Sequence, residues 1–190
     1  MVSQETLRCF IAVELPQDIR DELVALAVRL KDPGLQASWV SPGNMHLTLR
    51  FLGDVTAEGR DRLIELLSEA YQSVSPFTLQ VREVGVFPNL RRPNVIWAGV
   101  HPLEGPLQTI QAAAEMAARA IGLPPETKPF KAHLTLARVK QLNGESFQAR
   151  FDTEREFAGG EFTVHGVSLL SSKLTPKGAI HTCLREFHFD

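Results

Sequence analysis

The chain has 190 residues, of which 44% are hydrophobic and 22% are charged. That composition is typical of a globular protein and excludes a largely disordered chain. The formal net charge of −2 excludes a protein that binds long nucleic acid through bulk positive charge, but it is compatible with a pocket for one or two phosphates. The first residues, MVSQETLRCFIAVELP, include an early acidic residue and only a short apolar run. We therefore expect neither a signal peptide nor a membrane span, and a cytoplasmic location.

The predicted elements alternate between strands and helices. Helices are indicated by apolar residues at helical spacing, strands by short apolar or alternating runs, and loops by Pro and Gly. In chain order we expect a strand at 7–15, a helix at 18–31, strands at 37–40 and 45–53, a helix at 58–71, strands at 77–87 and 95–100, a helix at 103–121, a strand at 131–139, a polar stretch at 143–156 with room for a short helix, and strands at 160–172 and 179–189.

The two cysteines, Cys9 and Cys183, each lie inside an apolar, strand-like stretch. We expect both to be buried free thiols, with a disulfide only if their strands are neighbours. Because the chain has no Cys-x-x-Cys pair, a thiolate zinc site is excluded.

One short motif occurs twice. His-Leu-Thr-Leu stands at 46–49 and again at 133–136, a separation of 87 residues that is close to half the chain. A strand, a helix and further strands run through each half, and each half holds one copy of the motif. This repetition favours an internal duplication on an α+β scaffold, with the two copies related by a pseudo-two-fold axis.

Strand alternation gives each copy of the motif a polar face. His46 and Thr48 point one way, with Leu47 and Leu49 on the other face, and His133 and Thr135 repeat the pattern. If the polar faces meet, two imidazoles and two hydroxyls surround one volume. That set suits phosphoryl chemistry without a metal, since one histidine can take a proton from water while the other gives one to the leaving oxygen. The threonines can hydrogen-bond the phosphoryl oxygens.

Two other interpretations of the motif are less favoured. A single His-x-Thr on a strand is usually a surface or core pair, but its repetition favours catalysis. A metal site held by His46 and His133 lacks an acidic or third histidine ligand at a suggestive spacing, whereas zinc sites usually have three or four ligands. We therefore expect no metal and no cofactor.

The order of the motifs resembles the 2H phosphoesterases, and most closely the RNA 2′,3′-cyclic phosphodiesterases, formerly called 2′-5′ RNA ligases. The similar segments span nearly the whole chain: RCFIAVELP, WVSPGNMHLTLRFLGD, GVFPNLRRPNVIWAGV, KPFKAHLTLARV and LLSSKLTPKG. The resemblance implies a single domain over 1–190, with a bilobal α+β fold: two pseudo-symmetric, duplicated lobes, each an antiparallel sheet with flanking helices, around a central cleft. It also implies that the chain acts on RNA with 2′,3′-cyclic phosphate ends or on 2′,3′-cyclic nucleotides. Because no domain or linker in the sequence suggests an oligomer, we expect a monomer, without membrane contact.

The resemblance further implies a role for each residue of the motif. A 2′,3′-cyclic phosphate would be opened to a 2′-phosphomonoester, with His46 as proton donor, His133 as proton acceptor, and Thr48 and Thr135 on the phosphoryl oxygens. The residues alone do not distinguish the two histidines. Two alternatives stay open: 2′-5′ ligation as the reverse reaction, and a non-catalytic module that binds RNA ends or nucleotides.

Three further residues are candidates by the same resemblance. Phe51 would contact a base and Arg138 the substrate, yet strict alternation turns both away from the histidine face, so each needs a bulge or a strand end before it. His181 stands where relatives commonly have Tyr, and it would add a third imidazole near the cleft.

Overall fold

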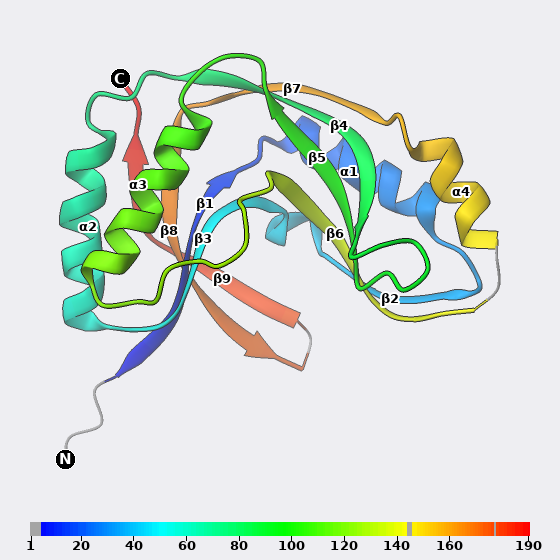
Figure 1. Ribbon diagram of the computed structural model, residues 1–190, viewed down its shortest axis with the longest axis horizontal. Coiled ribbons are helices and arrows are strands. Elements are labelled where there is room, and N and C mark those ends of the chain that lie inside the picture. The colour runs from blue at the N-terminus through cyan, green and yellow to red at the C-terminus, as the bar shows by residue number, and fades with distance from the viewer. Residues whose placement is uncertain (1–4, 144–145, 177) are drawn as a thin grey trace.

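The computed structural model describes residues 5–143, 146–176 and 178–190, which form an antiparallel sheet with helices packed on it (Figure 1). In chain order the elements are β1 (Thr6–Glu14), α1 (Gln17–Leu30), β2 (Leu35–Trp39), the 3-10 turn η1 (Pro42–Asn44), β3 (His46–Thr56), α2 (Ala57–Tyr71), β4 (Phe77–Phe87), β5 (Val95–Pro102), α3 (Leu107–Ala120), β6 (His133–Leu142), α4 (Ser146–Glu154), β7 (Ala158–Val164), β8 (Gly166–Thr175) and β9 (Gly178–His188).

The described residues form a sheet of nine strands, which falls into two parts: β7, β4, β5, β6 and β2 in one, and β3, β1, β8 and β9 in the other. The order is β7-β4-β5-β6-β3-β1-β8-β9, and β2 pairs with β6 beside this path. Between β3 and β6 one residue pair in the described part of the chain, Leu47 opposite Leu134, joins the two parts. The predicted α+β class is therefore confirmed, and the sheets of the two lobes meet at this seam.

Helices α1 and α3 each pack against the part of the sheet that does not contain the strand before them in the chain. Helix α1 follows β1 in the chain but packs against β7 and α4, whereas α3 follows β5 but packs against β3 and α2 (Figure 1). Helix α1 buries the stripe Ile19, Leu23, Leu26 and Leu30, as its helical spacing predicts. Each lobe is thus built from both halves of the chain. No helix among the described residues is both long and apolar enough to cross a bilayer.

The predicted strand at 160–172 is wrong, because the structure has two strands there. Strand β7 pairs with β4 in one part of the sheet, and β8 pairs with β1 in the other. The chain changes parts at Gly166, where a Cβ would collide with the carbonyl oxygen of Phe187. Glycine allows this close approach of two backbones.

The two cysteines differ from each other. Cys9 is buried and free, as expected, whereas Cys183 is free but exposed, which contradicts its predicted burial. Cys183 lies on β9, whose only described sheet neighbour is β8, so β9 is an edge strand of the sheet.

Candidate active site

The polar residues of the two motifs lie around the seam of the sheet. Leu47 and Leu134 are fully buried and point into the core. Alternation directs the side chains on either side of each leucine to the opposite face. One residue pair therefore brings four polar side chains to the same region: His46, Thr48, His133 and Thr135.

A bulge in β3 changes the alternation after the first motif. Two consecutive residues of β1, Ile11 and Ala12, pair with Arg50 and Thr48, so Leu49 is an extra residue on β3. Leu49 and Arg50 are consequently both buried, and Phe51 returns to the face of Thr48. Phe51 is 56% exposed and lines the pocket described below.

The second motif has the same irregularity at the matching position. Two consecutive residues of β5 pair with Ala137 and Thr135, so Leu136 is the extra residue of β6. Leu136 and Ala137 are both buried, and Arg138 returns to the face of Thr135. In both copies the bulge lies three residues after the histidine, and the residue five after the histidine reaches the pocket.

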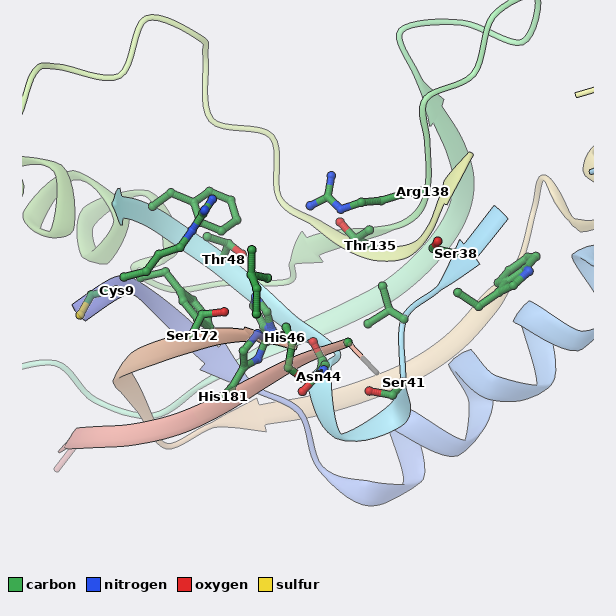
Figure 2. A pocket seen from close by; sticks show the side chains of 18 of the residues that line it. Cys9, Ser38, Ser41, Asn44, His46, Thr48, Thr135, Arg138, Ser172 and His181 are labelled. Atoms are coloured by element: carbon green, nitrogen blue, oxygen red, sulfur yellow. Dashed lines mark hydrogen bonds between the residues drawn. The ribbon is translucent and has the colours of Figure 1, made fainter. Parts of the chain in front are cut away.

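A pocket of about 510 Å³ lies over this face and is lined by His46, Thr48, Phe51, Thr135 and Arg138 among others (Figure 2). His133 is not among its lining residues. Its ring lies perpendicular to that of Phe87, with 5.1 Å between ring centroids. His133 shares the face of β6 with Thr135, two residues away.

Each motif histidine is held by a backbone carbonyl two residues earlier in the chain. Nδ1 of His46 is 2.8 Å from the carbonyl oxygen of Asn44, and Nδ1 of His133 is 2.7 Å from that of Lys131. A carbonyl only accepts hydrogen bonds, so Nδ1 carries the proton in both neutral rings. In each ring Nε2 is then left to accept a proton when neutral or to donate one when charged.

Burial makes His46 difficult to protonate in the free protein. Its pKa is lowered to about 4, first by burial and then by the positive charge of the nearby His181, while the hydrogen bond to Asn44 acts in the opposite direction. Burial also lowers the pKa of His133, and the charge of Lys131 adds to that effect. Both motif histidines are therefore neutral near pH 7, and a bound anion favours their protonation.

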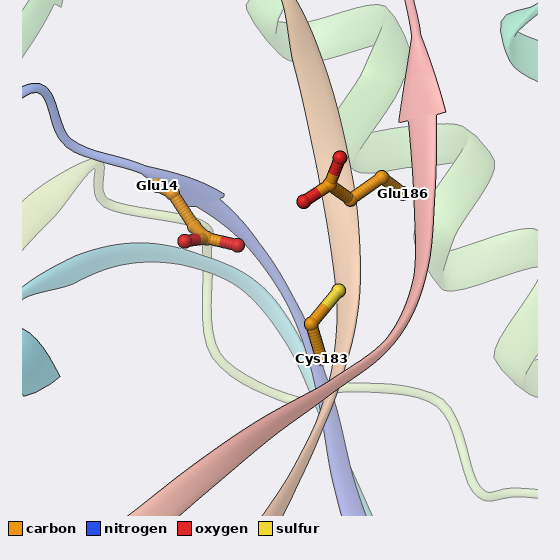
Figure 3. Close-up of side chains that lie close together, drawn as sticks. All are labelled: Glu14, Cys183 and Glu186. Carbon is orange, nitrogen blue, oxygen red and sulfur yellow. The ribbon is translucent and has the colours of Figure 1, made fainter.

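One group of three possible metal ligands occurs in the described part of the chain: Glu14, Cys183 and Glu186 (Figure 3). All three are exposed, and their ligand atoms lie within 4.8 Å of one another. Neither His46 nor His133 belongs to this group, so it is separate from the histidines that carry the expected chemistry.

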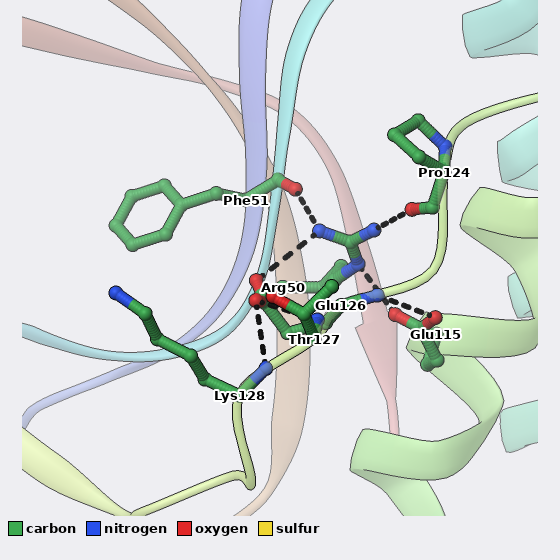
Figure 4. Close-up of polar contacts among 7 residues, drawn as sticks. All are labelled: Arg50, Phe51, Glu115, Pro124, Glu126, Thr127 and Lys128. Carbon is green, nitrogen blue, oxygen red and sulfur yellow. Dashed lines mark hydrogen bonds and ion pairs between the residues drawn. The ribbon is translucent and has the colours of Figure 1, made fainter.

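Arg50, which follows the first motif directly, is buried beneath the site. Its Nε lies 2.6 Å from Oε2 of Glu115, and its Nη groups donate to the carbonyl oxygens of Phe51 and Pro124 (Figure 4). A weaker ion pair joins it to Glu126 at 3.6 Å. Arg50 thus ties the connection between α3 and β6 to the backbone of Phe51.

Sequence reasoning missed Asn44 as a site residue. Its carbonyl holds His46, and its side chain donates to the carbonyl oxygen of Ala179 in β9. The corresponding residue of the second copy is Lys131, so no shared residue type signals the position. The contact to each histidine is made by the backbone, which any residue supplies.

Comparison with known proteins gives one family. Residues 13–97 and 100–181 match the family described as LigT like phosphoesterase. The RNA 2′,3′-cyclic phosphodiesterase of Aquifex aeolicus is 32% identical, over 97% of this chain and 98% of that protein, and that of Archaeoglobus fulgidus is 37% identical, over 95% and 99%. A crystal structure of Escherichia coli LigT complexed with 3′-AMP is 27% identical with a TM-score of 0.81, over 97% of this chain and 99% of that one. This chain therefore belongs to the LigT-like phosphoesterases.

Proposed function

We propose that this chain hydrolyses the 2′,3′-cyclic phosphate of RNA ends, or of 2′,3′-cyclic nucleotides, to a 2′-phosphomonoester by metal-independent acid–base catalysis. The observation that carries the proposal is the seam, where two His-x-Thr pairs share one face and each histidine has its Nδ1 on a backbone carbonyl. The substrate class is supported by relatives named RNA 2′,3′-cyclic phosphodiesterase over nearly the full length of the chain.

His133 is the proton acceptor in this mechanism. Its Nε2 takes a proton from a water molecule while the water oxygen forms a bond to phosphorus. Its lowered pKa supports the role, because the ring is neutral at pH 7 and ready to accept.

His46 is the proton donor. Its Nε2 gives a proton to the 3′ oxygen as the bond between phosphorus and that oxygen breaks. The negative charge of the bound phosphate offsets the burial that disfavours the charged ring. One proton enters on His133 and one leaves from His46 in each turnover, and exchange with solvent restores both rings.

Four other side chains complete the proposed site. The hydroxyls of Thr48 and Thr135 donate to the non-bridging oxygens, where negative charge gathers in the transition state. Arg138 contributes a fixed positive charge beside Thr135, and Phe51 offers an exposed ring on which a base can stack.

The test is to incubate the purified chain with adenosine 2′,3′-cyclic phosphate in EDTA and to assign the product by ³¹P NMR. Formation of adenosine 2′-phosphate supports the proposal, and a 3′-phosphate would refute the assigned leaving group. A parallel reaction with RNA ends that carry 2′,3′-cyclic phosphate and 5′-hydroxyl groups detects 2′-5′ ligation. Binding of the cyclic phosphate without turnover would instead indicate a non-catalytic module.

The proposal also covers the location, the oligomeric state and the domain organisation of the chain. The chain acts as a cytoplasmic monomer on RNA ends, and residues 1–190 form a single domain of two duplicated lobes. The duplication is supported by the matching bulges at Leu49 and Leu136 and by the matching contacts of the two histidines to carbonyls. Sedimentation of the purified chain tests the monomer.

A further inference from the structure

A third imidazole lies in the pocket next to His46. The rings of His181 and His46 are 5.3 Å apart between centroids and 69° apart between planes. Both also contact the buried ring of Phe10, at 4.7 Å for His46 and 4.9 Å for His181. Figure 2 shows the two imidazoles close together, and both line the pocket. The three rings therefore form one cluster, and all three line the pocket.

Asn44 holds the two imidazoles in this arrangement. Its carbonyl oxygen accepts from Nδ1 of His46, and its side-chain Nδ2 donates to the carbonyl oxygen of Ala179 at 2.8 Å, two residues before His181. Strands β1 and β8 lie between β3 and β9 in the sheet. In a flat sheet three strand spacings would separate β3 and β9 by about 14 Å. The sheet therefore curls so that the start of β9 reaches the first motif, and Asn44 fastens it there.

The charges around the two imidazoles favour an anion. Among the described residues, the titratable or charged side chains that line the pocket are Arg8 and Cys9 from β1, His46 from β3, Arg138 from β6 and His181 from β9, and none of these lining residues is Asp or Glu. Strand β8 contributes Ser172, which pairs with His181 and carries no charge. Burial lowers the pKa of His181, as it does that of His46. A phosphate in the pocket counteracts this, because an opposite charge favours the protonated rings.

We propose that His181 is a substrate-contacting residue, which in its protonated form donates a hydrogen bond to a non-bridging oxygen of the bound phosphoryl group. His46 remains the donor to the leaving oxygen, and His181 keeps its proton, so no bond to His181 forms or breaks in the reaction. The identity of the substrate rests on the proposed function, whereas the contact itself applies to any phosphate. Phosphate binding should then take up a proton and depend on pH through His181.

Inorganic phosphate is the probe, and its binding to the full chain is measured by calorimetry at pH 5.5 and pH 8. The wild type is compared with His181→Phe, which keeps a ring against Phe10, and with His188→Phe, an exposed histidine of the same strand outside the pocket. His181→Phe should lose at least tenfold in affinity at pH 5.5, because a charge-assisted hydrogen bond is removed. The loss should be smaller at pH 8, where His181 is neutral. Since phosphate itself titrates, proteins are compared at equal pH, and His188→Phe should match the wild type.

A second variant and a second readout separate this contact from a purely structural role. His181→Gln keeps a neutral donor, so it should recover part of the affinity lost in His181→Phe but none of the extra affinity at low pH. NMR titration of His46 should give a pKa above about 4 in both variants, since the like charge of His181 is gone. Equal phosphate affinity in wild type and both variants at both pH values, or an unchanged pKa of His46, would refute the contact. Neither measurement needs turnover, so a failure to open cyclic phosphate would overturn the proposed function alone.

Discussion

Leu47 and Leu134 face each other as the residue pair that joins the two parts of the sheet. Both are fully buried, and the polar residues of the two motifs flank them on the opposite face. The pairing of these two leucines therefore brings the two motifs together. Stability and activity should be coupled at this point of the molecule.

Leu47→Ala should lower the free energy of unfolding by about 2–5 kcal/mol, because it removes a fully buried side chain and leaves a cavity. The activity of the folded fraction should fall as well, because the residue pair that holds the two motifs next to each other is weakened. Urea unfolding measures the first effect and the initial rate per folded molecule the second. The matched control is Val28→Ala on α1, which is 58% exposed and should change stability by about 0.5 kcal/mol or less. A stable but fully active Leu47→Ala would contradict the role of the seam.

His46→Ala and His133→Ala should each lower kcat/KM for a 2′,3′-cyclic nucleotide by about 10²–10⁴, the usual contribution of one proton transfer. The double variant should lose much less than the product of the two single losses, because the two groups act in one step. Circular dichroism checks the fold, and His165→Ala on the link between β7 and β8 is the control. Full activity in either single variant would refute the two-histidine mechanism.

The expected pH dependence of kcat/KM follows from the lowered pKa values of His46 and His133. The active form needs His46 protonated and His133 neutral, and kcat/KM reports these groups in the free protein. Because the pKa of His46 is about 4 and that of His133 is also lowered, kcat/KM should be highest below pH 6.5. It should then fall by about tenfold per pH unit as the protonated fraction of His46 decreases. The optimum of kcat should lie at higher pH, since bound phosphate raises the pKa of His46. A kcat/KM that is constant between pH 6 and pH 8 would contradict this assignment.

Much of this site follows from strand periodicity alone. Alternation over His46–Leu49 and over His133–Leu136 divides each motif correctly into a polar and a buried pair. The same rule misplaces Phe51 and Arg138, because a bulge inserts one residue into each strand and nothing in the local residue types marks it. Such bulges depend on pairing with β1 and β5, which is a property of the folded sheet.

Long-range contacts account for the other differences between the sequence-based predictions and the structure. The stretch around Gly166 alternates like one strand, yet its two halves pair with strands from different parts of the sheet. The contact between His46 and His181 depends on the curl of the sheet and on Asn44. Local sequence reports which face a side chain takes, but not which distant strand it meets.

Arg50→Met should destabilise the chain by about 3 kcal/mol, because it leaves the partly buried carboxylate of Glu115 without its partner. Thermal unfolding of Arg50→Met, Glu115→Gln and the double variant gives a double-mutant cycle. The loss of stability in the double variant should be smaller than the sum of the two single losses. KM should rise in Arg50→Met, since Arg50 also holds the carbonyl of Phe51. Additive losses would show that the ion pair has no coupling energy.

Phe51→Ala should raise KM more than it lowers kcat, because the ring is proposed to stack on the base and to take no part in proton transfer. Stacking of one base on an aromatic side chain contributes about 1–3 kcal/mol, so KM should rise by roughly 5- to 150-fold. Phe51→Trp keeps a stacking surface and is the matched control, and it should retain most of the affinity. Ribose 2′,3′-cyclic phosphate, which lacks a base, provides the decisive comparison. Its kcat/KM should be similar in wild type and Phe51→Ala, and an equal loss on both substrates would instead mean that Phe51 positions β3 rather than the base.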